Sequence, residues 1–420
     1  MKFIHTADWH LGNSMHDIDR TQESEVFLKW LREQIQATGA QALVVAGDIF
    51  DTANPSNEAK AQYYRFLASL LDTQCRNIVL VGGNHDSASL LDAPSDLLDV
   101  LKIQVVGSIC GRSEESLVRE LLDEKGEAVA ICAMVPYARE PELRPYVTDK
   151  EAVFADNAYK GLYAKIWDIA QSVRGDRQIP VIATGHLYAA GLEGRPEGDQ
   201  GEGMRNHGVR DIVGHLGTVP VSVFPEGFDY VALGHIHYTT MVGKNPKVRY
   251  SGSPFILGFD EAKMPHHVLL VEANAGALPE VTKIETPQFF NFVRVEGPTE
   301  EIRRQLRELG KNPGDKPLKV EIVYEYKIGV NIREELSAVL DTDAFEVVNW
   351  KTTRSDILSA SDFTDDSLDS VKELSEEDVF KRLIMFRVGV TEMNDDVQKQ
   401  FDEFWPLFQG LMEEVEKDNH

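Results

Sequence analysis

The sequence predicts an α/β protein. Over the first 270 of its 420 residues, short apolar runs alternate with segments whose apolar residues recur at helical spacing. Continuously apolar runs are typical of strands that are covered on both faces. Such alternation defines an α/β domain, which we place at residues 1–280. The expected strands are residues 2–5, 42–46, 77–81, 128–135, 179–184 and 230–233.

Two helices are expected between the first three strands. Gly39 marks the end of the first helix, and Ser56 is the expected N-cap of the second. One face of the first helix carries Val26, Phe27, Trp30, Leu31 and Ile35, and one face of the second carries Phe66, Leu67, Leu70 and Leu71.

The pattern changes near residue 285. Residues 285–352 predict a small α+β capping domain of β-α-β-α-β order. Its expected elements are a strand at 292–295, a helix at 299–309 closed by Gly310, a strand of alternating Leu318, Val320, Ile322 and Tyr324, a helix at 332–340 and a strand at 345–350.

The last part of the chain is expected to be an acidic linker, residues 353–374, followed by C-terminal helices, residues 375–420. The final helix has an apolar stripe that Pro406 should bend or split. The stripe either folds back on an earlier domain or docks on a partner protein. It consists of Val397, Phe401, Phe404, Trp405, Phe408, Leu411, Met412 and Val415.

The net charge of −26 argues at first against a nucleic-acid partner, since phosphate binding normally requires a basic face. Residues 355–420 hold 18 Asp or Glu against 6 Lys or Arg, so this tail alone contributes −12. The rest is still acidic, and any attraction for phosphate there must come from local patches or bound cations.

The N-terminus and the cysteines predict a cytoplasmic protein. The opening MKFIHTADWH turns polar within five residues, so we expect no signal peptide, and no apolar run approaches a membrane span. Cys75, Cys110 and Cys132 lack C-x-x-C spacing and lie in or beside apolar segments, which predicts reduced core thiols.

Metal-binding side chains follow five of the apolar runs. A single Asp or His in such a place usually caps a turn or satisfies a structural hydrogen bond, but five in succession are hard to obtain by chance. Side chains just past the carboxyl ends of strands converge on one crevice, where ligands bind. The five blocks are Asp8-Trp9-His10, Gly47-Asp48 with Asp51, Gly83-Asn84-His85-Asp86, Gly185-His186 and Gly234-His235-Ile236-His237.

The types of ligand indicate the chemistry. Carboxylate, imidazole and amide groups without thiolate suit Mn²⁺, Fe²⁺ or Zn²⁺ rather than a structural cysteine site. The candidates are too many for one tetrahedral ion, but two ions about 3.5–4 Å apart that share Asp48 would use them all. These seven are Asp8, His10, Asp48, Asn84, His186, His235 and His237.

This series of blocks resembles the calcineurin-like metallophosphoesterase superfamily, whose signature is D-x-H, GDxxD, GNHD/E, H and GHxH. The stretches HTADWHLG, VAGDIFDTANPS, YVALGHIH and RYSGSPFILGFDE are similar to nuclease subunits of double-strand-break repair complexes. The similarity is strong to about residue 275, looser in the capping domain and weak in the C-terminal helices, where LSEEDVFKRL is closest. It implies a β-sandwich flanked by helices.

The resemblance also implies roles for the site residues. One ion would be held by Asp8, His10, Asp48 and His237, and the other by Asp48, Asn84, His186 and His235. Catalysis is implied for His85 and Asp51. His85 would donate a proton or hydrogen bond to the departing sugar oxygen, and Asp51 would orient it, as in related phosphatases. Archaeal repair nucleases have a second histidine at the position of Asp51.

The remaining features are assigned more modestly. We expect His5, His16, His207, His215, His266, His267 and His420 to be structural or surface residues. Trp9 is expected to pack beside the site. Residues 191–208 are glycine-rich and acidic, which predicts a mobile loop whose role the sequence leaves open.

The leading hypothesis is a Mn²⁺-dependent DNA exonuclease and endonuclease that works in repair and recombination. The resemblance implies two divalent ions, a homodimer, a capping domain that guides DNA, and terminal helices that bind a coiled-coil ATPase. A phosphodiesterase or nucleotidase for small molecules is the alternative, because the same metals serve it. GDIFDTA lacks the arginine of the protein-phosphatase motif GDxxDRG, and a decayed scaffold would have lost ligands.

Overall fold

The protein is described from a computed structural model. The described residues are 1–16, 18–149, 153–189, 218–312, 314–325, 331–353, 380–381 and 398–406. They divide into two compact units. The first holds Met1–Glu296, Glu300–Ile322 and Leu336–Trp350, and the second holds the remainder. The predicted border between residues 280 and 285 falls inside the first unit and stays a prediction.

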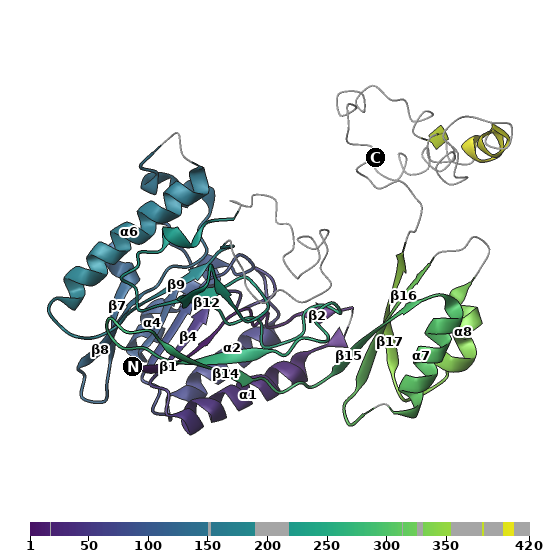
Figure 1. Ribbon diagram of the computed structural model, residues 1–420, viewed down its shortest axis with the longest axis horizontal. Helices are drawn as coiled ribbons and strands as arrows, with labels where there is room; N and C mark the ends of the chain where they lie inside the picture. Colours follow the sequence, from purple (N-terminus) through teal and green to yellow (C-terminus); the bar gives the residue numbers. More distant parts are fainter. Residues whose placement is uncertain are drawn as a thin grey trace. The chain divides into compact units, whose positions relative to one another are not determined.

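Two six-stranded sheets form the main part of the first unit (Figure 1). In spatial order, the first sheet contains β14 (Glu280–Glu285), β13 (His267–Glu272), β1 (Lys2–Thr6), β4 (Ala42–Ala46), β5 (Asn77–Val81) and β6 (Ile103–Val106). The second contains β11 (Thr240–Val242), β12 (Asn245–Tyr250), β10 (Tyr230–Gly234), β9 (Val181–His186), β8 (Ala128–Ala133) and β7 (Val118–Leu122). The central strands of each sheet run parallel.

The alternation of side chains along the first sheet explains why its strands are apolar on both faces. Along β4, Val44 joins a core cluster that also contains residues of the second sheet. Leu43 and Val45 join the cluster formed with the first helices. β4 is therefore covered by the opposite sheet on one side and by helices on the other.

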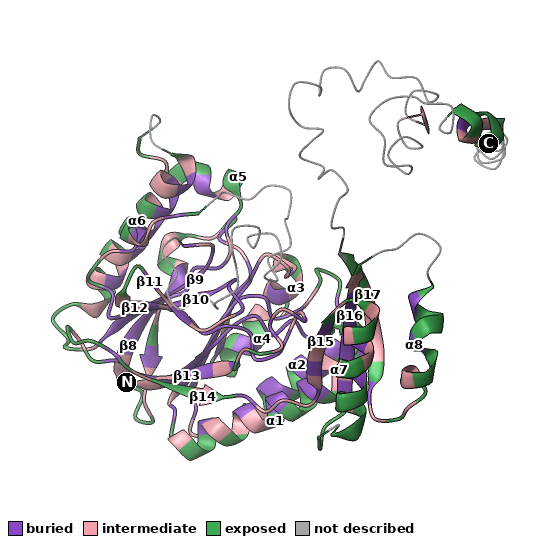
Figure 2. Ribbon diagram, turned by 45° about the vertical axis from the view of Figure 1, so that its right-hand side comes forward, coloured by how far each residue is buried: buried purple, intermediate pink, exposed green. Residues whose placement is uncertain are grey.

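Helices flank this sandwich (Figures 1 and 2). Apolar residues of the first two helices pack on the first sheet, and α6 lies on the second. The helices of this region are α1 (Thr21–Thr38), α2 (Asn57–Leu70), α3 (Ala88–Asp92), α4 (Ser95–Val100), α5 (Glu140–Leu143) and α6 (Phe154–Arg174). The predicted α/β class and the sandwich flanked by helices are both confirmed.

The predicted ends of the first two helices are correct. Gly39 follows α1 with a left-handed φ of 68°, which suits glycine. Ser56 caps α2, and its Oγ accepts a hydrogen bond from the Ala59 amide at 3.1 Å. Val26 and Leu71 are expected on the buried faces, but they are 40% and 41% exposed. Leu71 is exposed because α2 ends before it.

A three-stranded sheet follows the sandwich, in the order β15 (Asn291–Gly297), β16 (Leu318–Glu325) and β17 (Glu346–Thr353). With α7 (Thr299–Lys311) and α8 (Ile332–Leu340), it reproduces the predicted β-α-β-α-β order. One detail was wrong: Gly310 lies inside α7, because its backbone continues the helix instead of turning left-handed.

Three further expectations have mixed outcomes. Cys75 and Cys132 are buried free thiols, but Cys110 is exposed because it lies in the turn after β6. Trp9 is fully buried between Phe27 and Phe66, which confirms a packing role.

The loop at 191–208 and the linker at 353–374 lie outside the described residues, apart from residue 353. Within the described part of the chain, no helix is long and apolar enough to cross a membrane.

Candidate metal centre

The predicted ligands lie where strands of the two sheets end. Asp8 and His10 follow β1, and Asp48 follows β4. His186 is the last residue of β9, which ends two residues later than the expected strand at 179–184. Asn84 follows β5, while His235 and His237 follow β10. The two sheets meet through β4 with β9 and β10, which brings these strand ends together.

The ligand atoms form two groups. In the first, Asp8, His10 and His237 offer atoms that lie within 4.8 Å of one another, and all three side chains are buried. In the second, Asp48, His186 and His235 meet the same limit and are also buried.

Two further contacts complete this arrangement. The Asn84 Oδ1 atom lies 2.9 Å from His186 Nε2 and 3.0 Å from His235 Nδ1, so the amide belongs to the second group. Asp48 lies between the groups, since its Oδ2 atom is 3.2 Å from His186 Nε2 and 3.7 Å from His10 Nε2. The structure therefore brings all seven predicted ligands together.

Hydrogen bonds turn the histidine rings so that a defined nitrogen faces the centre. His186 Nδ1 donates to the main-chain oxygen of Ala46 at 2.9 Å, which leaves Nε2 for a ligand. His10 Nδ1 faces Asp51 Oδ1 at 3.2 Å, and His237 Nδ1 faces Glu261 Oε1 at 3.3 Å. A second partner of this kind is typical of metal-binding histidines.

The Nε2 atom of His10 indicates that a cation fits between the predicted ligands. The Nε2 atom of His10 is buried and forms no hydrogen bond with any described residue. A buried polar atom without a partner is costly, and a cation at this point would satisfy it. The donor set of imidazole, carboxylate and amide without thiolate also suits divalent ions of the Mn²⁺ and Zn²⁺ kind.

The electrostatics of the centre favour positive charge. Burial alone would lower the pKa of His186, but the carboxylate of Asp48 outweighs it and raises the pKa to about 9. Burial would raise the pKa of Asp48, yet the neighbouring histidines bring it below its usual value. Burial raises the pKa of Asp8 to about 7. An added cation would stabilise both carboxylates in their charged forms.

The backbone is strained at four of the ligands. Asp8, His10, Asp48 and His235 have φ values of 53°, 44°, 48° and 102°. Non-glycine residues in such conformations cost about 1–3 kcal/mol each and concentrate at functional sites. At these strand ends, the backbone gives up local stability to hold the predicted ligands in position.

Glycines before the ligands allow the strand ends to approach closely. A Cβ atom on Gly83 would lie 2.1 Å from Asp48 Oδ1, and one on Gly47 would lie 2.1 Å from His186 Nδ1. Neither distance is compatible with a side chain. Glycine is thus required at both positions, because a neighbouring side chain occupies the space that a Cβ atom would need.

His85 stands beside the two groups. Its Nδ1 atom lies 2.8 Å from the main-chain oxygen of Asp51, and its amide donates to Asp48 Oδ1 at 2.9 Å. The ring centroid is 4.8 Å from that of His10. The oxygen that holds His85 Nδ1 is therefore a carbonyl, while the Asp51 carboxylate bonds His10 and, at 2.9 Å, Asn13 Nδ2.

Three residues around the centre were given no role in the sequence analysis. Asp86 is buried, and its carboxylate accepts hydrogen bonds from the amides of Ile49, Phe50 and Gly83. Its place at the end of GNHD was a usable signal. Glu261 and Asn13 contact His237 and Asp51, but no periodicity or strand end marks them in the sequence.

The comparisons with known proteins agree with this geometry. Residues 1–239 match the calcineurin-like phosphoesterase family. Because this match covers more than half of the chain, the protein belongs to that family, and its buried His and Asp clusters are candidate metal sites.

Curated relatives define the family more narrowly. The SbcD chain of nuclease SbcCD from Escherichia coli K12 is 31% identical over 413 residues, which cover 95% of this chain and 96% of the relative. The corresponding SbcD chain of Rhodobacter capsulatus is 34% identical over 68% of this chain and 70% of its own. That of Bacillus subtilis is 32% identical over 66% and 67%. Within the phosphoesterases, the chain belongs to the SbcD nucleases.

Proposed function

We propose that this protein is a two-metal DNA exonuclease and endonuclease that acts in repair and recombination as the SbcD component of an SbcCD-type complex. The observation that carries the proposal is the similarity to the Escherichia coli SbcD chain over 95% of the sequence. The seven predicted ligands, which lie close together, support it. A minimal phosphatase would need neither the capping sheet nor the terminal helices.

In this proposal, Asp8, His10, Asp48 and His237 hold one ion, and Asp48, Asn84, His186 and His235 hold the other. When bound, two such ions polarise the phosphate and supply a nucleophilic water at neutral pH. We propose Mn²⁺ for both, since the donor set suits it.

The part of His85 follows from its hydrogen bond. Because Nδ1 faces the Asp51 carbonyl, Nδ1 carries a proton, and Nε2 is the nitrogen that can serve the substrate. Water attacks phosphorus and loses a proton, the bond from phosphorus to the sugar oxygen breaks, and that oxygen takes a proton from Nε2 of His85; the proton that the water loses passes through solvent and restores the ring. Asp51 supports this step through its main-chain oxygen.

The partners are proposed from the relatives. An SbcC-type coiled-coil ATPase would bind residues 375–420, the capping domain would guide DNA, and two copies of this chain would pair in a heterotetramer in the cytoplasm. An acidic chain of this kind would draw much of its DNA affinity from the ATPase and the metals.

The test is cleavage of a linear DNA duplex and of a small phosphodiester, with Mn²⁺ or EDTA, in the presence and absence of the ATPase. Wild type should degrade duplex only with Mn²⁺, and His85→Gln should lose at least about 100-fold in rate, the scale of a proton-transfer contribution. Mn²⁺ binding by His85→Gln should stay at wild-type affinity. Turnover of the small diester with intact DNA in every condition would instead favour a small-molecule phosphodiesterase.

A further inference from the structure

The ligand histidines are supported in two different ways. His186 is held by the main-chain oxygen of Ala46, which belongs to β4 inside the sandwich. His237 is held by the side chain of Glu261, from the segment between β12 and β13. The orientation of His237 therefore depends on where that segment lies.

The carboxylate of Glu261 is well fixed. It is 4% exposed, and its Oε2 accepts a hydrogen bond from the Leu257 amide at 2.8 Å. Its Oε1 lies 3.3 Å from His237 Nδ1. With Nδ1 occupied in this way, Nε2 is the nitrogen of His237 that faces the metal centre.

Arg20 anchors the same segment. Its Nη1 donates to the main-chain oxygen of Ile256 at 2.6 Å, and its Nε donates to Glu23 Oε2 at 2.6 Å. The guanidinium carbon lies 5.6 Å from the ring centroid of Phe255 and 5.6 Å from that of Phe292. Phe292 belongs to β15, so this contact joins the segment to the capping sheet.

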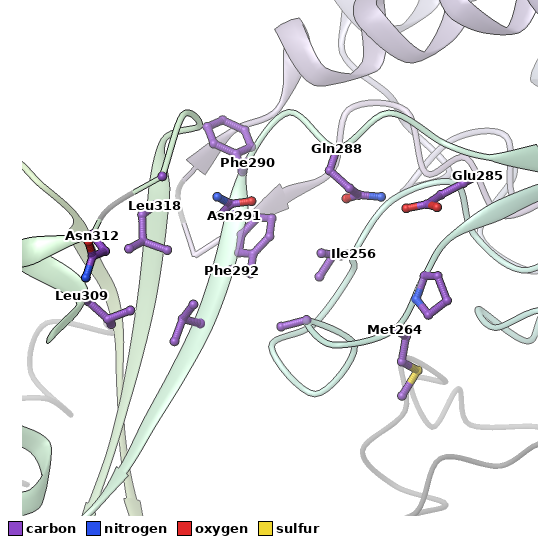
Figure 3. Close-up of a pocket in the computed structure, with 14 residues that line it drawn as sticks. Ile256, Met264, Glu285, Gln288, Phe290, Asn291, Phe292, Leu309, Asn312 and Leu318 are labelled. Atoms are coloured by element: carbon purple, nitrogen blue, oxygen red, sulfur yellow. The ribbon is translucent and has the colours of Figure 1, made fainter. Parts of the chain in front are cut away.

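An apolar cluster reinforces the connection. The cluster draws on the hairpin of β2 (Ser14–Met15) and β3 (Ile18–Asp19), on the segment before Glu261 and on β15. Figure 3 shows Phe292 on β15, Phe290 directly before this strand and Ile256 opposite them, around a cavity of about 350 Å³. The buried members of the apolar cluster are Met15, Ile18, Ile256, Phe259, Phe290 and Phe292.

We propose that Glu261 is a positioning residue for His237, and that the capping sheet acts through residues 256–261 on the affinity of the ion site formed by Asp8, His10 and His237. The second site, in which His186 is held by the main-chain oxygen of Ala46, does not share this dependence. The proposal rests on the proposed function only in requiring that the centre bind two ions.

Glu261→Gln tests the first part. Glutamine keeps the size of the side chain and an oxygen for the Leu257 amide, but it would present an NH₂ group to His237 Nδ1. That arrangement moves the ring proton to Nε2, the nitrogen needed for the ion. By calorimetry with Mn²⁺, wild type should bind two ions, and the variant should lose about 10–100-fold in affinity for one of them.

A matched control separates this effect from a general loss of stability. Glu321 is 3% exposed and accepts hydrogen bonds from Arg294 Nε at 2.5 Å and Asn349 Nδ2 at 2.6 Å within the capping sheet. Glu321→Gln should keep both affinities. The spin-coupled EPR signal of a Mn²⁺ pair should weaken in Glu261→Gln alone at limiting metal. Equal losses in the two variants, or none in Glu261→Gln, would overturn the role of Glu261.

Phe292→Ala tests the coupling to the capping sheet. It removes the ring beside Arg20 without touching a ligand, and the same one of the two Mn²⁺ affinities should fall. Ile322→Ala, a fully buried change in β16 of the same sheet, should leave both affinities unchanged. Unchanged affinities in Phe292→Ala, or equal losses in both alanine variants, would overturn the coupling.

The outcomes also separate this inference from the proposed function. Two ions bound by wild type, with no effect of Glu261→Gln, would refute the inference and leave the two-ion nuclease standing. A wild-type protein that bound fewer than two ions would refute the two-ion proposal itself.

Discussion

At the scale of single residues, the centre depends on close approach between strand ends. Asp48 contacts the turn after β5, where a side chain on Gly83 would overlap it. The short distances between Asp48 and the atoms of this turn allow the predicted ligands only one geometry. The strained backbone of Asp8 and Asp48 is the local cost of that geometry.

Gly83→Ala should therefore damage the centre. The new Cβ atom would lie 2.1 Å from Asp48 Oδ1 and 2.2 Å from the Asp48 amide nitrogen, so the carboxylate must shift. We expect a loss of at least about 100-fold in Mn²⁺-dependent cleavage, since displacements of about 1 Å have such effects. Steady-state cleavage of a labelled duplex measures it.

Gly126→Ala is the matched control. Gly126 has a positive φ of 81°, but nothing lies within 4 Å of a Cβ atom there. Some stability should be lost while cleavage is kept. If Gly83→Ala cleaves DNA as fast as this control, close packing around Asp48 is unimportant.

The seven proposed ligands could be picked out from the sequence because each lies at the end of an apolar strand or just after it and has a distinctive chemical type. The partners of those ligands could not. Glu261 reaches His237 from a segment without periodic structure, and the contact of Asp51 with His85 is made by a main-chain oxygen, which carries no sequence signal. Support of this kind depends on tertiary packing alone.

At the scale of elements, six of the strands and the first two helices of residues 1–280 were predicted, because buried strands are apolar and these helices have clear ends. The other strands, among them β6, β7 and β11 to β14, and the helices α3 to α6 were not predicted. The capping sheet was predicted from alternation and helical spacing. Two of the errors, at Leu71 and Gly310, fall at helix borders, where one turn more or less depends on packing. Val26 is exposed although it lies inside α1.

In the predicted C-terminal region the structure describes only residues 380–381 and 398–406, and these two stretches contact each other through aromatic rings. Phe380 lies 6.0 Å from Phe401 and 5.3 Å from Trp405, measured between ring centroids. Phe401 is 6% exposed, whereas Phe404 is 46% exposed. Of these two phenylalanines, Phe404 is therefore the one that a partner can reach without rearrangement of the packed rings.

Phe404→Ser should reduce co-purification with an SbcC-type ATPase and leave the thermal unfolding of the isolated chain unchanged. Phe401→Ser should impair both, because it removes a ring from the packed group. Capture of the ATPase measures the first effect, and calorimetry the second. Full capture by Phe404→Ser would show that the docking surface lies elsewhere.

At the scale of the whole molecule, a group of exposed apolar residues, two on α4 and one directly after it, supports the proposed homodimer. Leu97 is 66% exposed, Val100 is 77% exposed and Leu101 is 38% exposed. Several large apolar side chains together on a surface are typical of an interaction site.

The double variant Leu97→Glu, Val100→Glu should be monomeric by light scattering after size-exclusion chromatography, since repelling carboxylates would face each other in the pair. Leu278→Glu, also at a residue that is 66% exposed, should stay dimeric. A dimeric double variant would exclude α4 as the interface, and a monomeric wild type would exclude the homodimer.

The metal centre is proposed to hold two divalent cations where the strand ends of the two sheets meet. Anomalous diffraction from a crystal of the full chain grown with Mn²⁺ tests this most directly. We expect two peaks, one among Asp8, His10 and His237 and one among Asn84, His186 and His235, with Asp48 between them. A single peak, or peaks away from these side chains, would contradict the two-ion centre.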